Sequence, residues 1–585
     1  MELLRDSVMG QVIRRLTNDK ILLYSEEEAG ADEHAMVRTL RPISKHSRRV
    51  DTLVDTEREQ LDDAQLMGNK SRTPSKTDEE MAPTDKYAKR APAENLQNNT
   101  LKPEQEAESN NSGKQKDANF VVEWYSGEDP ENPQNWTGLK KAIVLFQLCA
   151  YTMAVYGASS MYVPGEEDVM REFHVGATPA ALGLAVYVAG YGIGPLIFAP
   201  LSEIASVGRN WVYIPTFFLF VILSIPTATV KNFAGLLVLR FLTGFFGSPC
   251  LANGGASVGD IYPALQIPIY LSSWTAVWFW GPAIGPVVAG FAVQAKGWRW
   301  GLWEIVWLTA PLFLLLSFAL PETSADNILH RRAARLRKIT GRKDILAASE
   351  IAQAQLTTGD VVWDALIKPM EIMIKDPAVL FTNIYTSLTY GIYYSFFEAF
   401  PLVYPQVYGF NIGETGLCFL TIGIACLIGI SIFFTYQFCY LLPEIRKNGP
   451  RAPEHRLVPA LFAVITLSAG YFMFGWTVRS NIHWIVSLVG VVILVTSNFL
   501  IFQSVFVYLP MSYPKYAASL FAANDLCRSA FAVACILFAR PMFENLGIGG
   551  GVSLLAGLSC LGIVGMFALW KYGAWLRSKS SFATS

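Results

Sequence analysis

The chain has 585 residues, of which 52% are apolar and 16% charged, whereas soluble globular proteins carry about 25% charged residues. Its formal net charge is -1 and its Lys and Arg residues do not gather on one face, which argues against a nucleic-acid-binding protein. The eight Cys and six His residues show no ligand spacing, so we predict no metal site and no cofactor.

The first 140 residues read as a polar N-terminal tail that is mostly disordered, because residues 1–118 contain few groups able to form a core. Four apolar residues near the start recur at helical spacing, namely Leu4, Val8, Val12 and Leu16. They predict either a short helix on the inner membrane surface or a transient helix without a role.

From Lys141 onward, apolar runs long enough to cross a bilayer alternate with short polar loops. We predict twelve spans, at residues 141–162, 180–200, 210–229, 235–258, 270–293, 301–320, 377–400, 413–438, 457–477, 483–508, 516–540 and 551–575. A polar central loop, 321–376, separates two sets of six, and a short tail, 576–585, closes the chain. This pattern predicts an all-α membrane protein of two pseudo-symmetric six-helix bundles, 141–320 and 377–575.

Basic residues are concentrated in the central loop, in the loop after the eighth span and in the final tail. Basic loops stay in the cytosol, so both termini are predicted to be cytosolic. The sequence contains no nucleotide-binding GxxxxGK[ST] loop and no HExxH motif. We therefore predict no catalytic residues, a protein that is not an enzyme, and transport driven by an ion or substrate gradient.

The junction of the second and third spans contains glycines, a proline and two opposite charges, at Gly194, Pro195, Glu203, Gly208 and Arg209. Glycine permits close helix approach, and Glu203 could pair with Arg209 across an inner gate. The alternative is a capping acid beside a solvated arginine.

Three charged residues within or near spans are candidates for proton coupling: Arg240, Glu398 and Asp525. A charge inside a membrane is costly and marks a cavity or a partner. The alternatives are an Arg240 side chain that snorkels to the interface, a solvated Glu398, and an Asp525 neutralised by Arg528 at i, i+3.

The fifth span contains two Gly-Pro steps and a further glycine, at Gly281, Pro282, Gly285, Pro286 and Gly290. They predict a kinked helix with a smooth face, or a plain packing kink. Aromatic and amide side chains of several spans are candidates for lining a substrate cavity, with ordinary packing as the alternative: Trp274, Trp278, Tyr393, Tyr394, Phe397, Asn498, Phe502 and Gln503.

Several segments of the sequence match known motifs. They are GPLxxAPLSE at 194–203, RxxxG from Arg240, GPxxGP from Gly281 and DPENPQNW at 129–136. Together they resemble the fungal drug:proton antiporters of the twelve-span class in the major facilitator superfamily, which include yeast transporters conferring benomyl and fluconazole resistance. The resemblance implies a role for Arg240 in proton coupling, and for the Gly-Pro motif in antiport.

The resemblance further implies a monomeric plasma-membrane exporter that moves diverse hydrophobic drugs or toxins, such as azoles and fungicides, by alternating access. Its partners would be these small molecules, protons and the lipid bilayer. Two other functions stay open: a dedicated exporter of one endogenous metabolite, toxin or polyamine, and a transporter-like receptor that senses nutrients through its long N-terminal tail.

Overall fold

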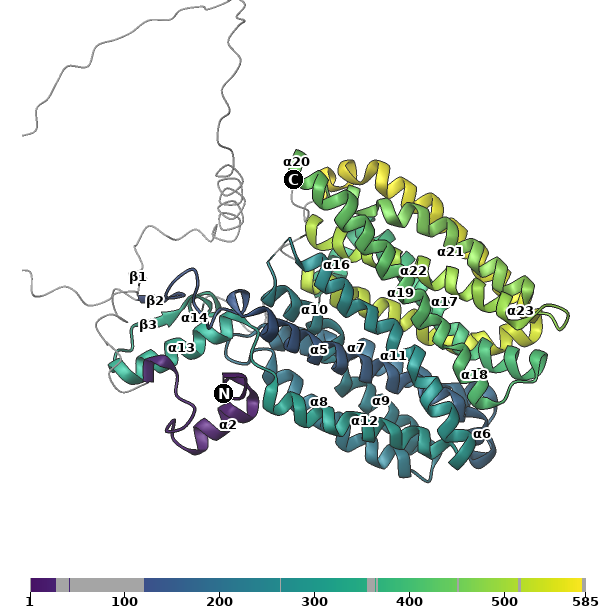
Figure 1. Cartoon of the computed structure of the whole chain (residues 1–585), viewed down its shortest axis with the longest axis horizontal. Helices are drawn as coiled ribbons and strands as arrows, with labels where there is room; N and C mark the ends of the chain where they lie inside the picture. Colours follow the sequence, from purple (N-terminus) through teal and green to yellow (C-terminus); the bar gives the residue numbers. More distant parts are fainter. Residues whose placement is uncertain are drawn as a thin grey trace, which may run out of the picture.

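The computed structural model describes residues 2–27, 41–42, 120–263, 265–354, 363, 367–449, 452–513 and 517–580. Most of the predicted disordered tail, including 43–119, lies outside these residues. The described chain forms two groups of long, roughly parallel helices, drawn in blue to teal and in green to yellow in Figure 1.

The first group contains six long helical segments, several of them extended by a shorter helix. They are α5 (Gly138–Ser160) with η3 (Val163–Gly165) and α6 (Glu166–Phe173), α7 (Ala177–Glu203), α8 (Asn210–Thr229), α9 (Phe233–Gly247) with α10 (Pro249–Ile261), α11 (Ile267–Lys296) and α12 (Trp298–Ala319). Each of the first six predicted spans overlaps one of these segments.

The second group begins with α17 (Pro377–Tyr408) and ends with a helical run broken at one glycine. Its members are α17, α18 (Ile412–Cys418) with α19 (Leu420–Thr435), η5 (Tyr436–Leu441) and α20 (Leu442–Asn448), then η6 (Pro453–Leu457) with α21 (Val458–Thr477), α22 (Trp484–Ser512) and α23 (Ala517–Lys579). Gly547 interrupts α23 with a φ of 71° and non-helical backbone, a conformation that glycine adopts without a Cβ penalty.

Within the described residues, ten segments are long and apolar enough to cross a membrane. The last of them contains the break at Gly547 and therefore supplies two crossings. The 32-residue α17 is the remaining long helix, and its many Tyr and Thr side chains lower its hydropathy. Twelve crossings result, as the sequence predicts.

Apolar side chains cover the outward surface of the bundles, for example Trp307 (67% exposed), Phe462 (71%) and Val564 (73%). Such exposure is unfavourable in water and favourable in hydrocarbon. The outer surface therefore fits a lipid environment.

The two groups meet along closely packed helix pairs. Ser529 of α23 packs at Gly192 of α7, where a Cβ on the glycine would lie 2.9 Å from the serine Oγ. A Cβ on Gly416 of α18 would likewise lie 2.5 Å from the Pro286 carbonyl oxygen of α11. Small residues thus allow the two halves to touch through their backbones.

Short elements gather at one end of the bundles, which we call the loop end, while α6 and α18 lie at the opposite, far end (Figure 1). The loop end contains α1 (Glu2–Asp6), α2 (Val8–Leu16), η1 (Ser25–Glu27), η2 (Pro133–Asn135), α13 (Ala325–Thr340), α14 (Ala348–Gln353) and α16 (Lys368–Lys375). A small sheet pairs β1 (Arg41–Pro42) antiparallel to β2 (Phe120–Val122), which pairs parallel to β3 (Ile345–Ala347).

The apolar stretch at the start of the chain forms two helices rather than one, because Ser7 caps α2 by accepting a hydrogen bond from the Gly10 N–H. Leu16 is 80% exposed and Val8 is buried. Part of this amphipathic segment thus packs on the protein, and part stays free to meet a membrane surface.

Candidate functional site

The centre of the molecule, between the two groups, is held by tyrosine hydroxyls from both. The Tyr191 hydroxyl of α7 lies 2.7 Å from that of Tyr390 and 2.9 Å from that of Tyr394, both on α17. All three rings are at least nine-tenths buried. Polar contacts therefore cross the interface between the halves at its middle.

Asp525 and Arg528 of α23 form the i, i+3 pair that their spacing suggests. The Arg528 Nε donates to the Asp525 carboxylate at 3.0 Å, and its Nη2 donates to the Tyr156 hydroxyl at 3.2 Å. The guanidinium also stacks 4.3 Å from the ring centre of Trp278, a favourable placement for a buried cation. Both residues line a small cavity at the centre of the molecule, which we call the central cavity and which Trp274 also lines.

The aromatic substrate-cavity candidates form one connected set. Trp274 and Trp278 lie 5.0 Å apart, the Tyr393 and Phe397 rings are 5.8 Å apart, and Phe502 lies 6.2 Å from Tyr390. All of these side chains are buried. The set forms a packed aromatic layer at the centre of the molecule, of which Trp274 and Trp278 line the central cavity. Aromatic side chains of this kind are suited to contact with drug-like molecules.

The two amide candidates carry polar atoms that lack partners among the described residues. Both side-chain polar atoms of Asn498 and the Gln503 carbonyl oxygen are buried without a hydrogen bond, while the Gln503 amide contacts Thr275. Unsatisfied buried polar atoms are costly. They mark places where a ligand or water could bind.

Arg240 of α9 is 1% exposed, so its side chain does not snorkel to an interface. It donates to the backbone carbonyls of Gly183 at 2.9 Å, Ala158 at 2.9 Å and Ser159 at 3.0 Å. The partners are carbonyls of α7 and α5 rather than a carboxylate. Arg240 thus ties three helices of the first group together.

The Gly-Pro motif of α11 lies against α5. A Cβ at Gly281 would lie 2.7 Å from the Met153 carbonyl oxygen, and one at Gly285 would lie 2.8 Å from that of Gly157. Pro282 and Pro286 lie inside the same helix. Gly290 faces the Ile412 carbonyl oxygen of the second group at 3.1 Å, so the smooth face of α11 contacts both halves.

The predicted gating motif is built differently from the sequence expectation. The Arg209 Nε lies 3.4 Å from the Asp260 carboxylate, and its Nη1 donates to Ser202 at 2.8 Å, whereas Glu203 is exposed at the end of α7. The Glu203–Arg209 ion pair suggested by the sequence is therefore not present among the described residues. The acidic partner of Arg209 is Asp260, at the end of α10. The intervening turn, closed at Gly208 with a φ of 76°, directs Arg209 inward.

Glu322 and Gly194 complete this region. The Glu322 carboxylate accepts hydrogen bonds from the backbone N–H groups of Arg209 and Asn210 at 3.0 and 3.1 Å, which places a negative charge at the N-terminus of α8. Gly194, beside Pro195, allows α7 to pack closely against α9, since a Cβ at this position would lie 2.8 Å from the Phe245 carbonyl oxygen.

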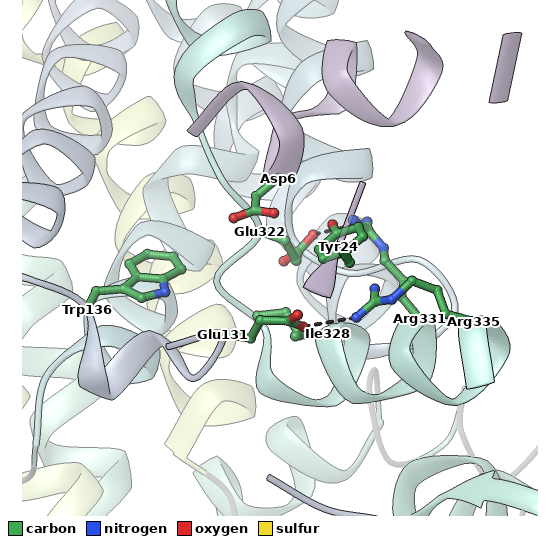
Figure 2. A pocket seen from close by; sticks show the side chains of 8 residues that line it. All are labelled: Asp6, Tyr24, Glu131, Trp136, Glu322, Ile328, Arg331 and Arg335. Atoms are coloured by element: carbon green, nitrogen blue, oxygen red, sulfur yellow. Dashed lines mark hydrogen bonds and ion pairs between the residues drawn. The ribbon is translucent and has the colours of Figure 1, made fainter. Parts of the chain in front are cut away.

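A second network at the loop end joins the start of the chain to α13. Arg332 is 1% exposed and its Nη1 donates to Asp129 at 2.7 Å, while Arg335 lies 3.4 Å from Glu26 and 3.0 Å from Glu131. Figure 2 shows part of this network, with Tyr24 beside Arg335 and a dashed line for the ion pair between Arg335 and Glu131. The Arg335 guanidinium stacks 3.7 Å from the Tyr24 ring centre.

The pKa values of this network follow from burial and from the two arginines. Burial alone would raise the pKa of Asp129, but hydrogen bonds from the Arg332 guanidinium and from backbone N–H groups outweigh burial and lower it. The pKa of Glu26 is likewise lowered, since Arg335 and Arg332 outweigh its burial. Burial prevails at Glu131 and raises its pKa.

Glu398 lies at the far end, in a cavity of about 340 Å³ between the two groups. It is 3% exposed, so it is not a solvated interfacial acid. Glu166 and Arg540 line the same cavity, and sequence reasoning missed both. Glu166 begins α6 in a run of three acids, which is typical of an exposed turn, and the sequence gives no sign that its side chain is buried in a cavity lined by both groups.

No group of three potential metal ligands occurs among the described residues. A closed bundle with buried charges at its centre and small residues where its halves meet is the architecture of a polytopic membrane transporter. The chain belongs to the Major Facilitator Superfamily, whose family model matches residues 148–534.

Relatives and solved structures agree with this assignment. The chain is 43% identical to the MFS-type transporter pyvG of Aspergillus violaceofuscus, over 79% of this chain and 85% of that protein. It is 40% identical to fluconazole resistance protein 1 of Saccharomyces cerevisiae, over 82% of this chain and 88% of that protein. A peptide transporter structure matches with a TM-score of 0.51 at 15% identity, over 74% of this chain and 95% of that one, which shows the fold alone.

Proposed function

We propose that this protein is a proton-coupled exporter of diverse hydrophobic small molecules, including azoles and other fungicides. The observation that carries the proposal is the buried aromatic set around Trp278 and Tyr390, which encloses the Asp525–Arg528 pair between the two halves. Aromatic walls with few polar groups accept many apolar ligands. The printed names of relatives, such as fluconazole resistance protein 1, support the same substrate class.

The protein acts as a monomer in the plasma membrane, with the loop end and both termini in the cytosol. The basic residues of α13, including Arg331, Arg332 and Arg335, support this orientation through the preference of basic loops for the cytosolic side. The far-end cavity then faces outward.

Glu398 takes up the proton in this mechanism. Glu398 and Asp525 each have a buried carboxylate oxygen without a hydrogen-bond partner, but the other oxygen of Asp525 is held by the permanently charged Arg528, and Arg240 is held by carbonyls. The charged groups that share the cavity with Glu398 are Glu166, Glu167 and Arg540. Protonation from the outer side removes a buried charge and favours return of the bundle to its inward-facing state.

The proposal is tested by efflux from reconstituted vesicles with a panel of chemically unrelated drugs. Uphill movement of several unrelated compounds supports a multidrug exporter. Movement of a single compound class would instead identify a dedicated exporter. Transport by a chain that lacks residues 2–27 would show that this part of the tail is not required for transport.

A further inference from the structure

The far-end cavity differs from the central one in size and in the elements that form it. It measures about 340 Å³, against about 30 Å³ for the central cavity, and ligand sites typically occupy about 300–1,000 Å³. Its walls come from η3, α6 and α11 of the first group and from α17, α18 and α23 of the second. Of these two cavities, the far-end one has room for a drug-sized molecule in this state and the central one does not.

Two buried carboxylates share this cavity with one cation. Glu166 and Glu398 are 6% and 3% exposed, and no described residue donates a hydrogen bond to the Oε1 atom of either. Arg540 lines the same cavity and acts on both carboxylates through its charge, but its Nε donates to Glu544 at 3.1 Å. Two buried carboxylates beside one shared cation leave an excess of negative charge, which is costly in a buried site, so the cavity attracts a further positive charge.

The remaining walls are mostly apolar and aromatic, with the polar side chains Gln294, Asn411 and Thr415 among them. The apolar and aromatic walls are formed by Val163, Pro164, Pro286, Pro401, Leu402, Pro405, Phe410 and Phe419. Phe419 is held in place by Phe400, whose ring centre is 4.5 Å away. Aromatic faces and carboxylates together recognise organic cations, whereas a metal ion would require a cluster of hard oxygen ligands.

We propose that the far-end cavity is a binding site for amphipathic organic monocations, with Glu166 and Glu398 recognising the charge. The inference rests on the proposed function, because export to the outer side makes this cavity the last one that a substrate occupies. Neutral substrates contact its apolar and uncharged polar walls and gain nothing from the two carboxylates. The site therefore distinguishes cationic from neutral cargo at release.

The test measures binding of tetraphenylphosphonium to the purified full chain without any gradient, and in parallel the transport of this cation and of a neutral azole. Glu166→Gln keeps the size of the side chain and removes its charge. The matched control is Asp168→Asn, which removes the same charge two residues along α6, from a side chain that pairs with the exposed Arg171 and does not line the cavity. We expect Glu166→Gln and Glu398→Gln to weaken binding of the cation by about tenfold or more, since a desolvated charge contact is lost, and Asp168→Asn to bind it as the native protein does.

Arg540→Gln provides the opposite change. Removal of the one cation that lines the cavity is expected to tighten binding of tetraphenylphosphonium several-fold, a result that misfolding cannot produce. Native-like binding in both Glu166→Gln and Arg540→Gln would overturn the proposal. Failure of the proposed function would appear differently, as absence of uphill transport of both compounds in the native protein while the binding differences remain.

Discussion

Gly285 offers a direct test of the contact between α11 and α5. A Cβ at this position would lie 2.8 Å from the Gly157 carbonyl oxygen, whereas ordinary contact begins at 3.4 Å. The backbone of α5 cannot rotate away as a side chain could. Gly285→Ala therefore requires the two helices to separate by about 0.6 Å in this region.

The cost of such overpacking is about 1–3 kcal/mol. If the clash exists in the state described here and is relieved by a separation of α5 and α11 in the other state, the equilibrium between the two states shifts by about 5- to 150-fold. Gly285→Leu adds three more carbons to the same contact and is expected to block transport.

The assay combines drug efflux with the unfolding temperature of the purified protein. The matched control is Gly557→Ala in α23, where a Cβ would meet no atom within 4 Å and where alanine favours the helix by about 0.5–1 kcal/mol. We expect reduced efflux for Gly285→Ala and unchanged efflux for Gly557→Ala. Native efflux and native unfolding temperature in Gly285→Ala and Gly285→Leu would refute the steric reasoning.

Three further predictions concern the buried charges and the loop end. Arg240→Ala removes three charged hydrogen bonds to buried backbone carbonyls, at about 1–3 kcal/mol each. We expect loss of uphill efflux with normal membrane insertion, and normal efflux would remove Arg240 from the coupling mechanism. Asp129→Asn removes a carboxylate whose pKa is lowered in the folded state, so the variant should unfold at a lower temperature than the native protein at neutral pH. This difference shrinks as the pH falls below about 4, because the native carboxylate then becomes protonated. A difference that grows on acidification would contradict the ion pair between Asp129 and Arg332. Tyr24→Ala removes the ring that stacks on Arg335. We expect it to lower the stability of this contact by about 0.5–2 kcal/mol and to speed hydrogen exchange in residues 2–27, whereas Tyr24→Phe keeps the ring and the native exchange pattern. Equal exchange in the two variants would contradict the stacking role.

The sequence was sufficient to predict the helices because each depends on its own composition. Apolar runs of span length predict crossings wherever they occur, and the i, i+3 pair of Asp525 and Arg528 follows from one helix alone. The exception was α17, whose hydroxyl-rich sequence is less apolar than the other spans and which is identified as a span by its length and its place in the pattern.

Contacts between distant segments could not be predicted in the same way. Asp260 became the partner of Arg209 because the end of α10 packs beside the start of α8, 51 residues away. Tyr24 and Arg335 lie 311 positions apart, more than half of the 585-residue chain, and part of the chain between them lies outside the described residues. Glu166 shares a cavity with Glu398 and Arg540 because the two groups pack together at the far end, and one sequence contains no local signal of that packing.

The coupling of export to a proton gradient is tested most directly by accumulation of a drug in reconstituted vesicles under an imposed pH difference. We expect accumulation above the equilibrium level while the pH difference persists, and loss of the accumulated drug when an ionophore collapses it. Glu398→Gln should show no response to the pH difference, because its side chain cannot bind and release a proton. Accumulation by the native protein that survives collapse of the pH difference would contradict proton coupling.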